Sequence, residues 1–81
     1  MKSKTLSLIL AHDLPPDAEY ARMRVVRAYC RGDLHVAGVH LRLVIGICVL
    51  LCAEEDVIHG LEKAHARIAQ KVTMAAQQGG H

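Results

Sequence analysis

Three arginines and a tyrosine recur at helical spacing in the first half of the chain. The group consists of Tyr20, Arg24, Arg27 and Arg31, which fall within about 60° of one another on a helix of 100° per residue. Guanidinium groups in a row bind phosphates or acidic protein surfaces. This Arg stripe is therefore a candidate partner-binding site, and its plainer interpretation is the solvated face of an amphipathic helix.

An acidic protein is preferred over nucleic acid as the partner of the Arg stripe. The formal net charge is only +2 with histidines neutral, which is too mild to indicate nucleic-acid binding by itself. No helix-turn-helix pattern surrounds the stripe, and neither Asn nor Gln accompanies it to read base edges. Binding of DNA by a dimer of the chain remains the alternative.

Two cysteines four residues apart form the only spacing that suggests a metal. If 48–59 is one helix, Cys48 and Cys52 share a face with Glu55 and His59. A single helix cannot bring His59, two turns beyond Cys52, to the same ion, so a dimer would have to complete the site. Small buried hydrophobic residues are the preferred interpretation. We expect no metal and no cofactor, and a metal-responsive or redox-responsive protein is the third interpretation.

The remaining candidates for chemistry are scattered. Six histidines show no metal-binding spacing and are expected on the surface, although a pH-sensitive interface is a sharper alternative. They are His12, His35, His40, His59, His65 and His81. The only serines, Ser3 and Ser7, lie in the N-terminal lead, and the acids of segment 54–56 suit the start of a helix. No catalytic motif is present, so we expect no enzyme.

The first half of the chain contains clear boundaries. Helix-starting prolines and a C-terminal Gly32 predict a helix over residues 16–31. The alternating leucines before it predict an N-terminal arm or short strand within 1–13. The last residues, 77–81, are expected to fray.

Two periodicities compete between residues 34 and 52. Alternate positions from Val39 to Leu51 are all apolar, which favours a strand. A helical stripe through the same region continues in phase to residue 75 with a mean step of about 3.5, the coiled-coil repeat. No Gly, Pro, Asn or Ser lies between Cys48 and Ile58. We therefore predict an all-α protein with a long or kinked helix over 35–76, forming a helical hairpin, and β-α-β-α is the alternative.

One small domain without a large core needs a partner chain. The 81 residues contain no Phe and no Trp, and a core of this size supplies only about 3–5 kcal/mol. We predict a homodimer because the apolar stripe is too long for one short helix to cover. The expected interface residues are Leu43, Ile47, Leu50, Val57, Leu61, Ile68 and Val72.

Location and function follow from composition. The longest uncharged apolar run, residues 43–53, is shorter than the roughly 20 residues that cross a membrane. The N-terminus resembles a signal peptide but lacks a cleavage site, and three cysteines without a CxxC motif suit the cytoplasm.

The absence of Asn and the preference for Arg over Lys suggest a bacterial or mobile-element accessory protein. We expect a homodimeric protein-binding modulator of the adaptor, inhibitor or anti-activator type, with a DNA-binding regulator as the alternative.

Overall fold

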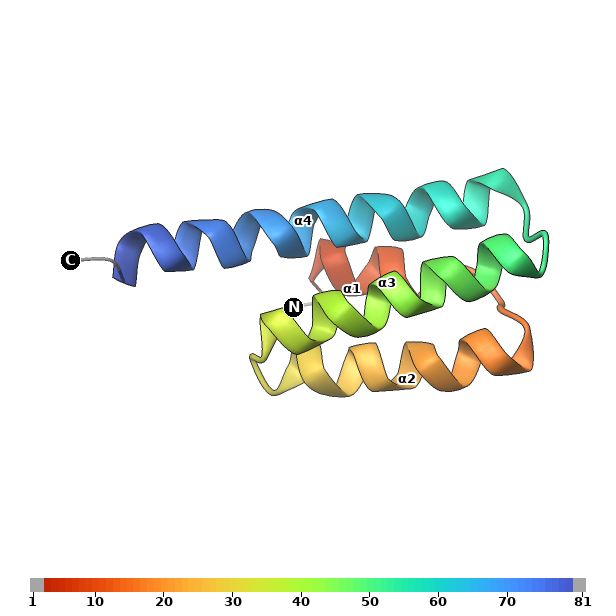
Figure 1. Ribbon diagram of the computed structural model, residues 1–81, viewed down its shortest axis with the longest axis horizontal. Coiled ribbons are helices and arrows are strands. Elements are labelled where there is room, and N and C mark those ends of the chain that lie inside the picture. Colours follow the sequence, from red (N-terminus) through yellow and green to blue (C-terminus); the bar gives the residue numbers. More distant parts are fainter. Residues whose placement is uncertain (1–2, 80–81) are drawn as a thin grey trace.

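The computed structural model describes residues 3–79 and contains four helices and no strand within them (Figure 1). The helices are α1 (Lys4–Leu10), α2 (Pro16–Cys30), α3 (Leu34–Leu50) and α4 (Glu55–Gly79). The all-α prediction is confirmed. The β-α-β-α alternative is wrong, since the disputed region 39–51 belongs to α3 and its C-cap residue.

The helices form a ring in which each contacts its neighbours in the sequence. α2 packs on α3, α3 on α4, and the short α1 closes the ring by contacting both α4 and α2. The diagonal pairs are farther apart, since no Cα atoms of α1 and α3, or of α2 and α4, approach within 8 Å. Long side chains still bridge one of these pairs, because Lys71 of α4 reaches Tyr29 of α2. Figure 1 shows α3 passing in front of α1, with α2 and α4 on either side. This is an up-down-up-down bundle with a truncated first helix.

The α2–α3 turn follows the signals in the sequence. Gly32 has φ +83°, a left-handed conformation that glycine adopts without steric cost. Its N–H donates to the carbonyl of Tyr29 at 3.0 Å, and the N–H of Asp33 donates to the carbonyl of Ala28 at 3.0 Å. These are the two hydrogen bonds of a Schellman motif. The observed α2 therefore agrees with the predicted helix to within one residue.

The α3–α4 turn uses the same motif without a glycine. Cys52 has φ +57°, its N–H donates to the carbonyl of Val49 at 3.1 Å, and the N–H of Ala53 donates to that of Cys48 at 2.9 Å. The helix expected over 35–76 is thus two antiparallel helices. Their apolar stripes share a phase because the stripes face one common core, and not because the helix is continuous.

The expected N-terminal arm is a helix. The side-chain oxygen of Ser3 accepts hydrogen bonds from the N–H groups of Thr5 and Leu6 at 3.1 and 3.4 Å and caps α1. Thr5 and Ile9, one helical turn apart, are both buried. The alternating leucines of this segment were therefore the wrong periodicity to follow, since the i,i+4 pair decides which face packs.

Helix α4 extends beyond the rest of the bundle. Its 25 residues carry it past the N-terminal end of α3 (Figure 1). The tail expected to fray over 77–81 is helical as far as Gly79. Residues 80 and 81 lie outside the part of the chain that the structure describes.

The core is aliphatic and belongs to one chain. Its largest fully buried apolar side chains are Ile9, Leu41, Ile68, Val25 and Val44. Leu61 and Ile68, expected at a dimer interface, are 2% and 1% exposed in this core. The stripe on α4 is therefore covered by the chain's own helices, and these two residues are not available to a second copy.

Polar bonds attach α1 to the bundle at both ends. The buried guanidinium of Arg22 donates to the carbonyls of Ile9 and His12 and pairs with Glu19. At the other end, the Tyr29 hydroxyl lies 3.0 Å from both the Ser3 hydroxyl and the Lys71 ammonium. The hydrogen bond from the Lys71 ammonium, and to a smaller extent that from the Ser3 hydroxyl, lowers the pKa of Tyr29. Arg22 thus has a structural role that sets it apart from the Arg stripe.

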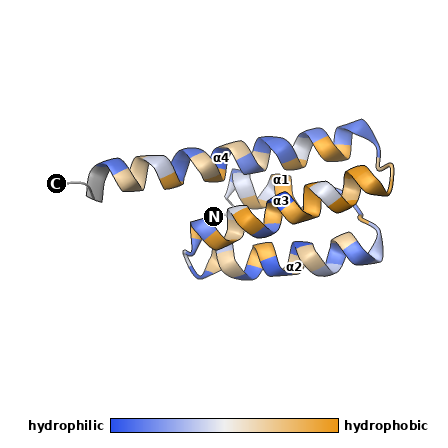
Figure 2. Ribbon diagram, in the orientation of Figure 1, coloured by the Kyte–Doolittle hydropathy of each residue, from blue (hydrophilic) through white to orange (hydrophobic). Residues whose placement is uncertain are grey.

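The most apolar helix is α3, which is coloured as hydrophobic along most of its length in Figure 2. It has 17 residues, about 25 Å of helix. Within residues 3–79, no helix combines the length and the apolarity needed to span a membrane.

The left-handed residue in the α3–α4 turn provides a test of the fold. We expect Cys52→Gly to stabilise the protein by about 1 kcal/mol, because a Cβ is strained at this φ, which is roughly a 4–8 °C rise in Tm for a domain of this size. Cys52→Ala is the matched control, since it removes the thiol and keeps the Cβ. Equal melting temperatures for both variants would show that the turn is not left-handed.

Candidate partner-binding surface

The Arg stripe lies on the exposed side of α2. Tyr20 is 67% exposed, and the guanidinium carbon of Arg24 lies 5.4 Å from the centroid of its ring. This cation–π contact orders one end of the stripe without neutralising it. Arg27 and Arg31 continue the stripe toward the α2–α3 turn and are also exposed.

A groove of about 500 Å³ runs beside α2, next to the end of α1. Its apolar lining consists of Leu10, Met23, Val26 and Cys30, and its charged lining of Glu19, Arg22, Arg27 and Arg31. Leu10 and Met23 are 49% and 55% exposed. This α1–α2 groove therefore combines an apolar floor with two cations of the Arg stripe.

Within residues 3–79, no acidic side chain forms an ion pair with the cations of the stripe. On the other side of α2, Arg24, Arg27 and Arg31 line a smaller hollow of about 190 Å³ with His40 of α3. Among the described residues, the one ion pair joins Arg22 and Glu19. Within the described residues, the charge of the stripe is therefore exposed and not paired with an acid.

The structure separates the predicted metal ligands. Cys48 is buried in the core, whereas Cys52 is exposed in the turn. Burial raises the pKa of the Cys48 thiol, and the nearby Arg22 charge opposes this rise. Glu55 and His59 belong to a different helix, α4. No three His, Cys, Asp or Glu side chains gather as a metal site among the residues the structure describes.

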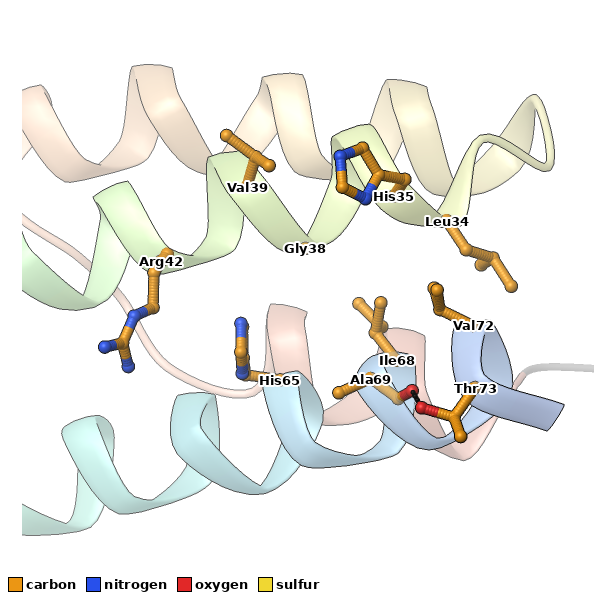
Figure 3. A pocket seen from close by; sticks show the side chains of 10 residues that line it. All are labelled: Leu34, His35, Gly38, Val39, Arg42, His65, Ile68, Ala69, Val72 and Thr73. Atoms are coloured by element: carbon orange, nitrogen blue, oxygen red, sulfur yellow. Dashed lines mark hydrogen bonds between the residues drawn. The ribbon is translucent and has the colours of Figure 1, made fainter. Parts of the chain in front are cut away.

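A second hollow, between α3 and α4, was not found from the sequence. Its volume is about 340 Å³, and His35, Arg42 and His65 lie around a largely apolar lining (Figure 3). Gly38 of α3 faces Ile68 of α4 beside this hollow, and a Cβ there would make an ordinary van der Waals contact with the Ile68 side chain at 3.5 Å. This α3–α4 hollow exists only because the helices are antiparallel in this register, which no local signal specifies.

The other predicted dimer residues are divided between the core and the surface. Ile47, Val57 and Val72 are partly buried and pack against the core. Leu43 and Leu50 are 55% and 83% exposed on α3. Only these two of the seven predicted residues are exposed large hydrophobic side chains.

Comparison with protein-family models, with curated proteins and with solved structures finds no match to this chain. Its function is therefore inferred from its own residues and surfaces.

The three free thiols offer a test of these placements. We expect Cys30 and Cys52 to react quickly with a thiol reagent in dilute native protein, and Cys48 to react only on unfolding. Reaction requires an accessible thiolate, and burial denies Cys48 both access and deprotonation. Mass spectrometry of the labelled peptides reports each site. Rapid labelling of Cys48 would contradict the packing of α3.

Proposed function

We propose that the protein is a non-enzymatic, homodimeric modulator of another protein, of the adaptor, inhibitor or anti-activator type, acting in the cytoplasm. The working surface is the α1–α2 groove with the Arg stripe along its edge. The observation that carries the proposal is the combination of an apolar groove with Arg27 and Arg31, which form no ion pair with an acid in the part of the chain that the structure describes. The partner presents an acidic segment with apolar side chains.

The groove suits an amphipathic helix or extended segment. Burial of apolar surface contributes about 25 cal/mol per Å², and Leu10 and Met23 offer such surface. Complementary charge then selects the partner and accelerates association. Arg27 and Arg31 would meet the acids that flank the apolar residues of such a helix, as in other helix-in-groove complexes.

A DNA-binding regulator is the second candidate, because three exposed guanidiniums also suit phosphates. An apolar groove beside the cations adds nothing to phosphate binding, so the same surface favours the protein partner. The two functions differ in salt dependence. Binding of nucleic acid falls steeply with salt, whereas apolar docking does not.

Charge reversal on the stripe tests the proposal. We expect Arg24→Glu with Arg27→Glu to abolish capture of the partner from a nuclease-treated host lysate. Both side chains are exposed, so thermal stability should stay within about 0.5 kcal/mol of the original protein. The matched control is Lys4→Glu with Lys63→Glu, an equal change of charge at exposed positions on α1 and α4.

Three results would contradict the proposal. Capture that nuclease eliminates would indicate nucleic acid. Unchanged capture by the stripe variant would move the working surface elsewhere. Unfolding of that variant would give the arginines a structural role.

A further inference from the structure

We propose that the outward face of α3 binds a second copy of this chain in an antiparallel, two-fold arrangement. In this dimer the C-terminal end of α3 in each copy places Leu50 against the α3–α4 hollow of the other. The inference gives the dimer of the proposed function its surface and its register. It uses no residue of the Arg stripe or of the α1–α2 groove.

Helix α3 is apolar on the side that the bundle does not cover. Val39, Leu43 and Leu50 are 57%, 55% and 83% exposed, and they lie on one helical face opposite the buried Leu41, Val44 and Cys48. A surface helix normally presents polar residues there, and a helix that is apolar all round is buried. Figure 2 colours most of α3 as hydrophobic, and the exposed side chains give its outward face the composition of an interface.

Gly46 lies in the middle of this exposed face. A Cβ at Gly46 would meet nothing within 4 Å, so the packing of the chain does not require a glycine. Glycine is also a poor residue for a helix interior. A glycine at this position would allow the backbone of a partner helix to approach closely. The proposed dimer therefore explains why residue 46 is a glycine.

The residues of this exposed face have the same spacing whether the helix is followed from its N-terminus or from its C-terminus. Positions 39, 43, 46 and 50 are separated by four, three and four residues. An antiparallel copy therefore places Val39 opposite Leu50 and Leu43 opposite Gly46, on both sides of the two-fold axis. The Leu43 side chain of one copy thus packs where Gly46 of the other copy has no side chain. An isologous interface requires such self-complementarity, because both copies use the same patch.

The same register brings each turn to a hollow. The partner's C-terminal end of α3 lies over the N-terminal half of α3, where His35, Val39 and Arg42 line the α3–α4 hollow. The turn leads into α4 and thus lies on the same side of α3 as the hollow. Leu50, which is 83% exposed and lies opposite Val39 in this register, is the side chain that reaches it first.

Charge favours this orientation over the parallel one. Glu54, Glu55 and Asp56 follow the turn and are exposed, while Arg42, His35 and His65 surround the hollow. An antiparallel dimer brings the acids of one copy to the Arg42 side of the hollow of the other. A parallel dimer would place the two acidic turns against each other.

A standard interface takes about 800 Å² from each partner, roughly one seventh of the 5579 Å² that the chain exposes. The outward face of α3, about 25 Å long, and the turn at its C-terminal end contribute to this area together.

Association is measured by light scattering and sedimentation of the full chain at micromolar concentration. We expect a mass of twice 8.9 kDa. Leu43→Glu should weaken the dimer at least tenfold or reduce the mass to that of one chain, with helical circular dichroism retained because the residue is exposed. Leu10→Glu, an equal change at an exposed leucine on another surface, should leave the mass unchanged.

Gly46→Gln provides a second variant that cannot disturb the monomer, since nothing lies near its Cβ. We expect it to lose the dimer as Leu43→Glu does. A native chain with the mass of one copy, or a dimer that survives both variants, would overturn the inference.

Cross-linking tests the register. With Cys30 and Cys52 replaced by serine, protein carrying Val39→Cys is mixed with protein carrying Leu50→Cys and treated with a short bismaleimide. We expect cross-linked dimers that contain one chain of each kind. Cross-linking of Val39→Cys to itself instead would show a parallel dimer and would overturn the proposed register.

These outcomes are separate from the partner-binding test. Leu43→Glu should remove the dimer, and charge reversal of Arg24 and Arg27 should remove the partner. Failure of the first leaves the α1–α2 groove as proposed, and failure of the second leaves the α3 interface as proposed.

Discussion

The structure depends on covering the inner face of α3, the most apolar helix of the bundle. The inner face of α3, with Leu41, Val44 and Cys48, is completely buried. Without Phe or Trp, the core is made of short aliphatic side chains, so helices must approach closely to exclude water. Ala18, Ala28 and Ala37 are fully or almost fully buried and permit that approach. The long α2 and α4 pack on the two sides of α3, and the seven residues of α1 close the ring opposite it. The outer face of α3 is what this arrangement leaves uncovered.

The sequence predicted the elements whose ends carry standard signals. Pro16 and Gly32 specify α2 because one suits the first turn and the other suits the left-handed C-terminal position. The end of α3 has the same hydrogen bonds around Cys52. Cysteine is not a typical turn residue, however, so the sequence does not predict a helix end there. The hydrogen bonds of the turn and the packing of two helices outweigh the strain of a non-glycine residue there. The turn between α3 and α4 could therefore not be located from the sequence. The shared phase of the two apolar stripes was interpreted as one long or kinked helix.

The candidate sites divide in the same way. The Arg stripe depends only on spacing within one helix, so it could be predicted before the fold was known. The α3–α4 hollow depends on which residues of two antiparallel helices lie opposite each other, and His35, Arg42 and His65 have no local pattern. The residues predicted at a dimer interface could be identified in part from the sequence. Periodicity identified apolar stripes correctly, but it could not distinguish Leu61, which faces the chain's own core, from Leu43, which faces outward.

The order of the helices in the ring decides whether both proposed surfaces can act at once. α1 lies diagonally across the bundle from α3, and no Cα atoms of the two approach within 8 Å. The α1–α2 groove is lined by Leu10 at the end of α1 and by the side of α2 that includes Met23 and Val26. A second copy seated on the outward face of α3 therefore leaves this groove open. The proposed dimer would carry two equivalent grooves related by the two-fold axis, so a partner with two acidic segments would gain avidity without any further contact. Self-association through α3, as proposed, would thus support partner binding through α2 and would not compete with it.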